Sequence, residues 1–374
     1  PFPSTLGGFP TLTWSHTRAL LRRLPAAHKY STATSHTMHD YINSYAPQMR
    51  MYPQMRLVYE AMMRENTVDD EPDAPEIKIY SETSEDPTPP WEFYYTNHML
   101  LSPALAPPSL LSLTSCSCPS GHCHLRKSSC PCWALQQSHT GPYDVSGFMY
   151  DASGLLKKPG LPVFECGSLC ACSEECRNRV VSQGRKCKVM LKKTENKGWG
   201  VFACERIPKG MFIGIYAGEL LGHEESEERA IKYDEFGRTY LFDIDWWYID
   251  AELDAKQAKV KQSNSDSDSD EDPPKRRPSK YTIDAYHAGN FTRFLNHSCD
   301  PNAALTPVYI DVDEIERPLL TIFSKRDIPP HEEITFSYSG DPDVDDDHPE
   351  PAHPKKGDAR VHVDCQCGAA KCKG

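Results

Sequence analysis

Short runs of apolar, aromatic and β-branched residues alternate with Gly, Pro and charged residues along much of the chain. Runs of this length, bounded by turn residues, are typical of β-strands. We predict strands over the ranges 77–82, 91–96, 187–194, 199–204, 211–220, 239–249, 281–285, 319–325 and 333–340. Two longer stretches, 55–66 and 222–236, favour helices instead. The pattern therefore predicts a mostly-β fold with few helices.

Two polar stretches interrupt this pattern. Residues 251–280 contain almost no large apolar side chains, so burial cannot offset the entropy of ordering them, and we predict disorder there. Within them, SNSDSDSDED offers serines beside acids as phosphorylation sites, and PKRRPSK resembles a short basic nuclear signal; a solubilising linker is the alternative for both. A second acidic, Pro-rich stretch, DPDVDDDHPEPAHPKKGD, precedes the last cysteines.

Composition narrows the class of protein. With 39% hydrophobic residues, a mean hydropathy of -0.60 and no apolar run near the length of a membrane span, the chain reads as a soluble protein. A net charge of -12 argues against strong direct nucleic-acid binding through phosphates and suits a basic peptide partner. Residues 1–39 lack Asp and Glu and resemble a transit peptide; we favour upstream sequence without a structural role, with translation starting at Met38.

Fifteen cysteines, an odd number with several C-x-C spacings and no secretory signal, indicate zinc binding rather than disulfides. Nine of them form two clusters: Cys116, Cys118, Cys123, Cys130 and Cys132, then Cys166, Cys170, Cys172 and Cys176. Nine thiolates, six bound to one ion and three shared between two, satisfy three tetrahedral zinc ions. The alternative is two ordinary zinc sites, with His122 or His124 as a further ligand.

A third cluster, Cys365, Cys367 and Cys372, has only three thiolates and lacks a fourth ligand. Cys187 and Cys204 lie in strand-like runs, which favours buried small side chains. The remaining Cys299 lies in the polar loop RFLNHSCDPN, which carries an amide, an imidazole and a thiol together. If Cys299 is the fourth ligand, one zinc ion ties the C-terminal segment over this loop, and we expect a binding site where the two meet.

Five motifs now resemble, in order, those of a SET domain. They are KGWGVFA (197–203), YAGEL (216–220), TYLFDID (239–245), GNFTRFLNHSCDPN (289–302) and EITFSY (333–338). The nine-cysteine block resembles a pre-SET region and CQCGAAKCKG a post-SET region. Over roughly residues 75–374 the combination is similar to heterochromatin-type histone H3 lysine 9 methyltransferases, and its Asp/Ser insert to fungal members.

The resemblance implies a fold of small curved β-sheets with a knot-like crossing under the NHSC loop, flanked by zinc-cysteine segments. It implies this organisation: an N-terminal extension, partly disordered, over 1–74; a pre-SET region with three zinc ions over 75–184; a SET domain over 185–340 with its insert at 251–280; an acidic linker over 341–360; and a post-SET segment with one zinc ion over 361–374.

The implied reaction is methyl transfer from S-adenosylmethionine to a lysine amine. The resemblance places Tyr338 and Tyr240 beside the reacting groups, with Phe336 on the same strand face as Tyr338. The implied cofactor-binding residues are Lys197, Gly198, Trp199, Gly200, Tyr240, Arg293, Asn296 and His297. For Arg293, a structural ion pair is the alternative. A Phe rather than Tyr at 336 leaves room for further methyl groups, so we expect di- and trimethylation.

The resemblance implies the histone H3 tail as substrate, heterochromatin proteins as partners, and a location on nuclear chromatin. Asp243, Asp245 and Asp284 are candidates to flank a groove for a basic peptide; solvated surface acids are the alternative. Family tails continue past the last cysteine to cover the cofactor, whereas this sequence stops at Gly374, so we expect truncation or a cover from another segment. Two other functions stay open: a catalytically weak chromatin scaffold, and methylation of non-histone lysines.

Overall fold

The computed structural model describes residues 5–6, 9–10, 30–31, 55–81, 87–90, 93–118, 123–234, 240–244, 279–338, 365–370 and 372. The predicted disorder of 251–280 therefore falls outside the described residues except for Ser279 and Lys280, and the acidic linker 341–360 and Asp245 fall outside them as well. Within the described part, no helix has the length and apolar character that a bilayer span requires. The described chain is mostly β, as the sequence predicts.

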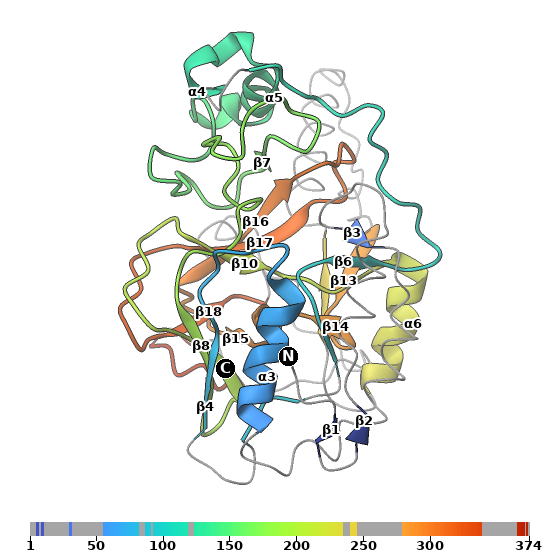
Figure 1. The fold of residues 1–374 in the computed structure, drawn as a ribbon, viewed down its shortest axis with the longest axis vertical. Helices are drawn as coiled ribbons and strands as arrows, with labels where there is room; N and C mark the ends of the chain where they lie inside the picture. Colours follow the sequence, from blue (N-terminus) through green and yellow to red (C-terminus); the bar gives the residue numbers. More distant parts are fainter. Residues whose placement is uncertain are drawn as a thin grey trace, which may run out of the picture.

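Three sheets of four or five strands form the strand core of the molecule (Figure 1). The first contains, in spatial order, β10 (Phe212–Ile215), β17 (Leu319–Ser324), β16 (Ala303–Tyr309) and β7 (Val163–Phe164). The second contains β12 (Leu241–Asp243), β13 (Tyr281–Asp284), β11 (Glu219–Gly222), β6 (Met99–Leu101) and β3 (Tyr30–Ser31). The third contains β15 (Asn296–His297), β18 (Glu333–Phe336), β9 (Trp199–Ala203), β8 (Val189–Lys193) and β4 (Lys78–Tyr80).

Two short pairings complete the described strands. They join β1 (Thr5–Leu6) to β2 (Phe9–Pro10), and β14 (Ala288–Gly289) to β5 (Tyr94–Tyr95). The two predicted helices are present as α3 (Met55–Thr67) and α6 (His223–Asp234), and α6 lies along one side of the sheets in Figure 1. Helix α3 packs its buried Tyr59, Met62 and Met63 into the same apolar cluster as the strands, so the strand core includes this N-terminal helix.

Two parts of the predicted strand pattern differ from the structure for physical reasons. The run 211–220 divides into β10 and β11, because the chain turns at Gly218, where a Cβ atom would lie 2.5 Å from the Asp284 carbonyl oxygen. Strand β16 was not predicted, and it contains Pro307, a residue that is unfavourable inside a sheet. The structure tolerates Pro307 because β7 pairs only with Val308 and Tyr309, which leaves the proline a strand partner on one side alone.

A separate lobe at one end of the molecule, at the top of Figure 1, carries the nine-cysteine block. This cysteine lobe (residues 116–118, 123–148 and 166–176) contains α4 (Cys123–Arg126), η2 (Lys127–Ser129), α5 (Pro131–Thr140) and η3 (Gly141–Tyr143). Helix α5 was not predicted, although Pro131 stands at its first position, where proline is favoured. The buried cluster of the lobe consists of the nine cysteines and Phe148, with Trp133 packed against it.

Candidate active site and cysteine clusters

The loop around Asn296 and the strand before Tyr338 meet in the third sheet. β15 pairs in parallel with β18, with Asn296 opposite Thr335 and His297 opposite Phe336. Beyond β18, the Tyr338 amide donates to Nδ1 of His297 (3.1 Å). The Tyr338 hydroxyl donates to the Leu295 carbonyl oxygen (2.7 Å). Two motifs far apart in the sequence are thus joined by main-chain and side-chain bonds.

An aromatic cluster surrounds Phe336. Its ring centroid lies 5.0 Å from that of Tyr338, 6.0 Å from that of Phe242 and 6.4 Å from that of Tyr216. Tyr216 and Phe242 were not predicted as site residues, because within YAGEL and TYLFDID they read as ordinary strand aromatics. The Tyr216 hydroxyl donates to the Tyr240 carbonyl oxygen (3.2 Å), which ties this cluster to the backbone of Tyr240.

Two phenols of the site, Tyr216 and Tyr338, are neutral at physiological pH. Burial raises the pKa of Tyr216, whose side chain is almost fully enclosed, with a further rise from Tyr338. Half of the Tyr338 residue is exposed, but desolvation around its hydroxyl still raises its pKa, with Tyr240 and Glu333 acting in the same direction. The cluster therefore presents uncharged hydroxyls and ring faces rather than phenolates.

Arg293 holds Tyr240 at the edge of this cluster. Its guanidinium lies 4.3 Å from the Tyr240 ring centroid and 4.0 Å from that of Phe93. Its Nε donates to the Ala285 carbonyl oxygen (2.8 Å) and Nη2 to that of Tyr286 (3.1 Å). Arg293 thus joins two aromatic rings to the backbone at Ala285 and Tyr286. Among the hydrogen bonds of the described residues, no carboxylate accepts from Arg293, so they do not include the ion pair given as its alternative role.

The glycine-containing turn 197–200 lies against Asn296. Gly198 has a φ of +72° with open space where a side chain would stand. A Cβ atom on Gly200 would lie 2.7 Å from Oε1 of Glu333 and 3.2 Å from Nδ2 of Asn296, so a side chain there would displace these two groups. Asn296 Nδ2 donates to Glu333 Oε1 (2.7 Å) and to the Trp199 carbonyl oxygen (3.2 Å). Glu333 also pairs with Lys197, so this acid, which sequence reasoning missed, connects both predicted cofactor segments.

These residues fit a small polar ligand. The indole Nε1 of Trp199 is buried and finds no hydrogen-bond acceptor among the described residues, although a buried donor normally has one. Next to it in the chain is the open space at Gly198, and the carboxylate of Glu333 stands against Gly200. The donor set, glycine turn and aromatic cluster together suit a ligand such as S-adenosylmethionine, which combines charged, polar and aromatic parts.

The acids predicted for a peptide groove separate in the structure. Asp243 is exposed on the edge strand β12 and accepts from the Thr282 hydroxyl (2.6 Å). The prediction for Asp284 is wrong, because its side chain is fully buried. It accepts from Arg229 Nη1 (2.8 Å) and from the Tyr233 hydroxyl (2.8 Å), so its charge is neutralised inside the fold.

All nine cysteines of the first block are buried, and they come together. Three sets of four have sulfur atoms within 4.8 Å of one another: Cys116, Cys118, Cys123 and Cys130; Cys116, Cys132, Cys166 and Cys170; and Cys116, Cys123, Cys166 and Cys172. Observed separations include 3.6 Å for Cys116–Cys123 and 3.5 Å for Cys132–Cys170. Four thiolates bound to one tetrahedral zinc ion at about 2.3 Å would lie about 3.8 Å apart, so the geometry fits zinc.

The fourth set contains Cys299, Cys365, Cys367 and Cys372. The Cys299 and Cys365 sulfurs are 3.8 Å apart, and His297 Nε2 lies 3.4 Å from the Cys299 sulfur. The C-terminal cysteines therefore meet the loop that carries Asn296 and His297. Of the two cysteines left aside, Cys187 is buried as predicted, whereas Cys204 is only half-buried.

Comparison with known proteins agrees with this geometry. A family model described as SET domain matches residues 198–339, and one described as Pre-SET motif matches residues 69–179. The chain belongs to the SET-domain family, and it is a member that carries a Pre-SET motif ahead of its SET domain.

Curated relatives include fungal proteins named "Histone-lysine N-methyltransferase, H3 lysine-9 specific". The one from Cryptococcus neoformans is 38% identical over 314 residues, which cover 81% of this chain and 17% of that protein. The one from Schizosaccharomyces pombe is 33% identical over 309 residues, which cover 81% of this chain and 55% of that protein. The chain thus spans less than two thirds of the length of these relatives.

Solved structures give the same fold. The Neurospora SET domain protein DIM-5, described as a histone lysine methyltransferase, is 28% identical with a TM-score of 0.54, covering 71% of this chain and 95% of that one. Arabidopsis thaliana SUVH6 in complex with SAM is 29% identical with a TM-score of 0.57, covering 80% of this chain and 52% of that one.

Proposed function

We propose that this protein is a protein-lysine N-methyltransferase that uses S-adenosylmethionine and acts on histone H3, at lysine 9, on nuclear chromatin. The observation that carries the proposal is the junction of β15 and β18, which joins Tyr338 to Asn296 and His297. The named activities of the fungal relatives support the choice of substrate. Heterochromatin proteins are the partners that this activity implies.

Methyl transfer from S-adenosylmethionine requires little acid catalysis by the protein. S-adenosylmethionine supplies a methyl group that is already electrophilic on its sulfonium. The protein must hold the lysine nitrogen in line and keep it neutral, although lysine titrates near about 10.4 in water. A channel formed by Tyr216, Tyr240, Phe242, Phe336 and Tyr338 would disfavour the ammonium form and lower the lysine pKa. The neutral hydroxyl of Tyr338 would orient the amine.

The cofactor would lie between the glycine turn and the NHSC loop. Lys197, Gly198, Trp199 and Gly200 would form one wall, and Asn296 and His297 the other. Tyr240, fixed by Arg293, would stand where the cofactor and lysine sites join. Arg293 itself would act through Tyr240 and the backbone of Ala285 rather than by touching the cofactor.

We propose three zinc ions in the cysteine lobe and one at the C-terminal set. Cys116, Cys123 and Cys166 each belong to more than one of the three sets, which suits sulfurs shared between two ions. The terminal pairs are then Cys118 with Cys130, Cys132 with Cys170, and Cys172 with Cys176. Cys176 fits its place because its thiol contacts Cys166, Cys123 and Cys172.

Phe336 would set the extent of methylation. It is almost fully buried, and it presents a ring edge where a tyrosine would present a hydroxyl to the amine or to a water molecule. Without that hydroxyl the amine is free to turn after the first transfer. We therefore expect di- and trimethyl-lysine as products.

The test is an assay of the zinc-loaded protein with S-adenosylmethionine and a panel of histone-tail peptides, with products identified by mass spectrometry. We expect up to three methyl groups on the lysine 9 peptide and none when lysine 9 is replaced by arginine. Tyr338→Phe should lower the rate by at least about 100-fold. Tyr143→Phe, a tyrosine of the cysteine lobe, is the matched control and should retain the wild-type rate.

Three outcomes would change the conclusion. Methylation of other lysine peptides alone would move the proposal to another target. Monomethyl-lysine as the only product would contradict the argument from Phe336. A protein that holds zinc and cofactor but methylates no peptide would favour a chromatin scaffold.

A further inference from the structure

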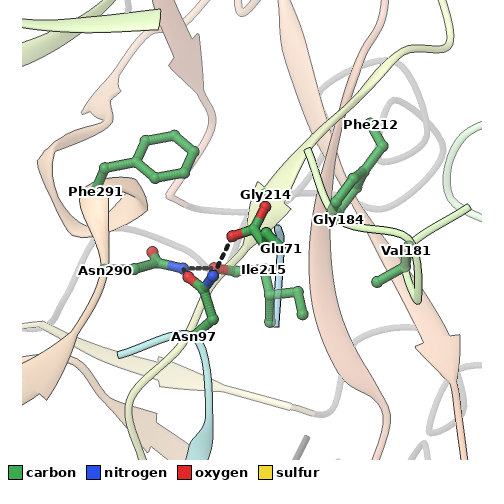
Figure 2. Close-up of a pocket in the computed structure, with 9 residues that line it drawn as sticks. All are labelled: Glu71, Asn97, Val181, Gly184, Phe212, Gly214, Ile215, Asn290 and Phe291. Carbon is green, nitrogen blue, oxygen red and sulfur yellow. Dashed lines mark hydrogen bonds between the residues drawn. The ribbon is translucent and has the colours of Figure 1, made fainter. Parts of the chain in front are cut away.

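A series of hydrogen-bonded polar side chains, made of one partly buried carboxylate and two buried amides, connects three distant segments. Figure 2 shows Asn97 between Glu71 and Asn290. Asn97 Nδ2 donates to Glu71 Oε1, and Asn290 Nδ2 donates to Asn97 Oδ1 (2.8 Å). Asn97 and Asn290 are 5% and 1% exposed, so neither amide exchanges these partners for solvent. Glu71 follows helix α3, within the predicted N-terminal extension over residues 1–74.

Glu71 at one end of the series, and the main-chain groups of Ile215 and Thr292 at the other, fix the same direction for its hydrogen bonds. A carboxylate is an acceptor only, whereas an amide side chain has one accepting and one donating end. Glu71 therefore turns the amide nitrogen of Asn97 toward itself and the oxygen toward Asn290. Asn290 must then present its own nitrogen to Asn97 and to the Ile215 carbonyl oxygen (2.9 Å). Its oxygen Oδ1 is left facing the other way.

That remaining oxygen organises the turn that leads into the site. Asn290 Oδ1 accepts from the Thr292 amide (2.9 Å) and hydroxyl (2.7 Å), which caps the short helix η4 (Phe291–Phe294). The residues directly after η4 are Leu295, whose carbonyl oxygen holds the Tyr338 hydroxyl, and Asn296. A reversed Asn290 amide would place a donor against the Thr292 amide and open this cap.

The surroundings leave no substitute for Glu71. Its other oxygen, Oε2, accepts from the Arg185 amide (2.7 Å), so both carboxylate oxygens are used. Gly184 has a φ of +78°, and a Cβ atom there would lie 2.8 Å from the Glu71 side chain. The adjoining cavity is about 10 Å³, room for at most about one water molecule, so it cannot hold a row of waters in place of the two buried amides.

We propose that Glu71 is a positioning residue for the cofactor and tyrosine site, acting through the ordered amides of Asn97 and Asn290 on η4. The inference rests on the proposed function for its catalytic consequence, but its structural part does not. Under this proposal the segment after α3, which lies outside the matched SET domain, helps to position the cofactor and tyrosine site.

The test uses a pair of substitutions that together move the carboxylate from position 71 to position 97 and keep the direction of the hydrogen bonds. Glu71→Gln puts an amide nitrogen against either Asn97 Nδ2 or the Arg185 amide, so one bond must fail. Adding Asn97→Asp restores the pattern, because the carboxylate introduced at position 97 accepts both from the amide introduced at position 71 and from Asn290. Glu76→Gln, which alters an exposed acid of the same segment, is the matched control.

Two measurements are made on each folded, zinc-loaded variant. Hydrogen exchange of the amides in residues 290–298 needs no activity, and steady-state kinetics give kcat and KM for S-adenosylmethionine. We expect Glu71→Gln to speed exchange and to lower kcat/KM about tenfold, the effect of one lost buried hydrogen bond. The double variant should return both to within about threefold of wild type, and Glu76→Gln should change neither.

The outcomes separate this inference from the proposed function. If wild type transfers no methyl group but exchange follows the predicted loss and rescue, the function fails and the positioning stands. If wild type is active and Glu71→Gln leaves exchange and kinetics unchanged, the positioning role is wrong. A double variant as impaired as Glu71→Gln alone would also overturn the positioning role, because the direction of the hydrogen bonds would then not be the cause of the loss.

Discussion

The cysteine lobe and the strand core are parts of one chain, but their interiors are built from different groups. The lobe buries nine thiols around Phe148, and its helices α4 and α5 are short. The core buries Val, Leu, Ile and aromatic side chains from three sheets and α3 in one continuous cluster. A segment with so little apolar surface cannot stabilise itself by burial alone, which is why small units of this kind depend on metal.

The largest expected effect comes from breaking the shared thiols of the lobe. Cys116 belongs to all three cysteine sets, so Cys116→Ser should release the lobe's zinc and unfold the lobe. Structural zinc contributes about 10–16 kcal/mol in small domains, as much as a whole domain's stability. Zinc content and hydrogen exchange of residues 123–148 and 166–176 measure the result. Cys204→Ser, which belongs to none of the sets, is the control, and an unchanged zinc content in Cys116→Ser would refute the assignment.

A smaller effect should follow from opening a cavity in the strand core. Ile213 of β10 is fully buried among the apolar side chains. Ile213→Ala should lower the free energy of unfolding by about 2–5 kcal/mol in urea titrations, with zinc content unchanged. Ile231→Ala, which alters an exposed isoleucine of α6, should cost less than about 0.5 kcal/mol. Loss of lobe zinc in Ile213→Ala would show that the two regions do not stabilise themselves separately.

The smallest expected effect concerns an ion pair at the surface of the core. Burial alone raises the pKa of Glu314, but hydrogen bonds from Lys280 and Tyr281 outweigh it and lower the pKa below its ordinary value. A carboxyl whose pKa is lower in the folded than in the unfolded state stabilises the protein at every pH above its unfolded-state pKa, about 4.3. This stabilisation is lost as the pH falls through the folded-state pKa. Glu314→Gln should therefore remove about 0.5 kcal/mol at neutral pH, and the loss should shrink toward zero in acid, by urea unfolding.

The control for this last prediction lies on the partner side chain. Lys280→Met removes the donor that lowers the Glu314 pKa, so it should reproduce most of the loss at neutral pH. A loss from Glu314→Gln that is equal at neutral and acid pH would mean that the side chain acts by packing and not by charge.

The sequence predicts best those features that repeat locally. The short apolar runs of β8, β9 and β17 and the polar helix α6 were expected from pattern alone. Helix α5 and strand β16 were missed because their support is tertiary: α5 is stabilised beside the thiol cluster, and β16 lies between two strands despite Pro307. Local signals cannot report partners that are distant in the sequence.

The same limit applies to the site. The motifs gave Tyr338, Asn296 and His297, and the structure brings them together, because short polar motifs carry their own chemistry. Glu333 and Tyr216 were missed, since a strand acid and a strand tyrosine have no special spacing. Asp284 was wrong for a related reason: it was predicted to flank a peptide groove from its charge alone, and the sequence does not show that Arg229, 55 residues earlier, pairs with it in the interior.

The parallel pairing of β15 with β18 also has a consequence for the order of folding. The Tyr338 amide and its acceptor His297 are 41 positions apart, and β16 and β17 fold between them. Closing so long a loop costs entropy that a pairing of two residues repays only after its neighbours are in place. We therefore expect the junction of β15 and β18 to form after β16 and β17 have folded, so a cofactor site built on that junction would be completed late.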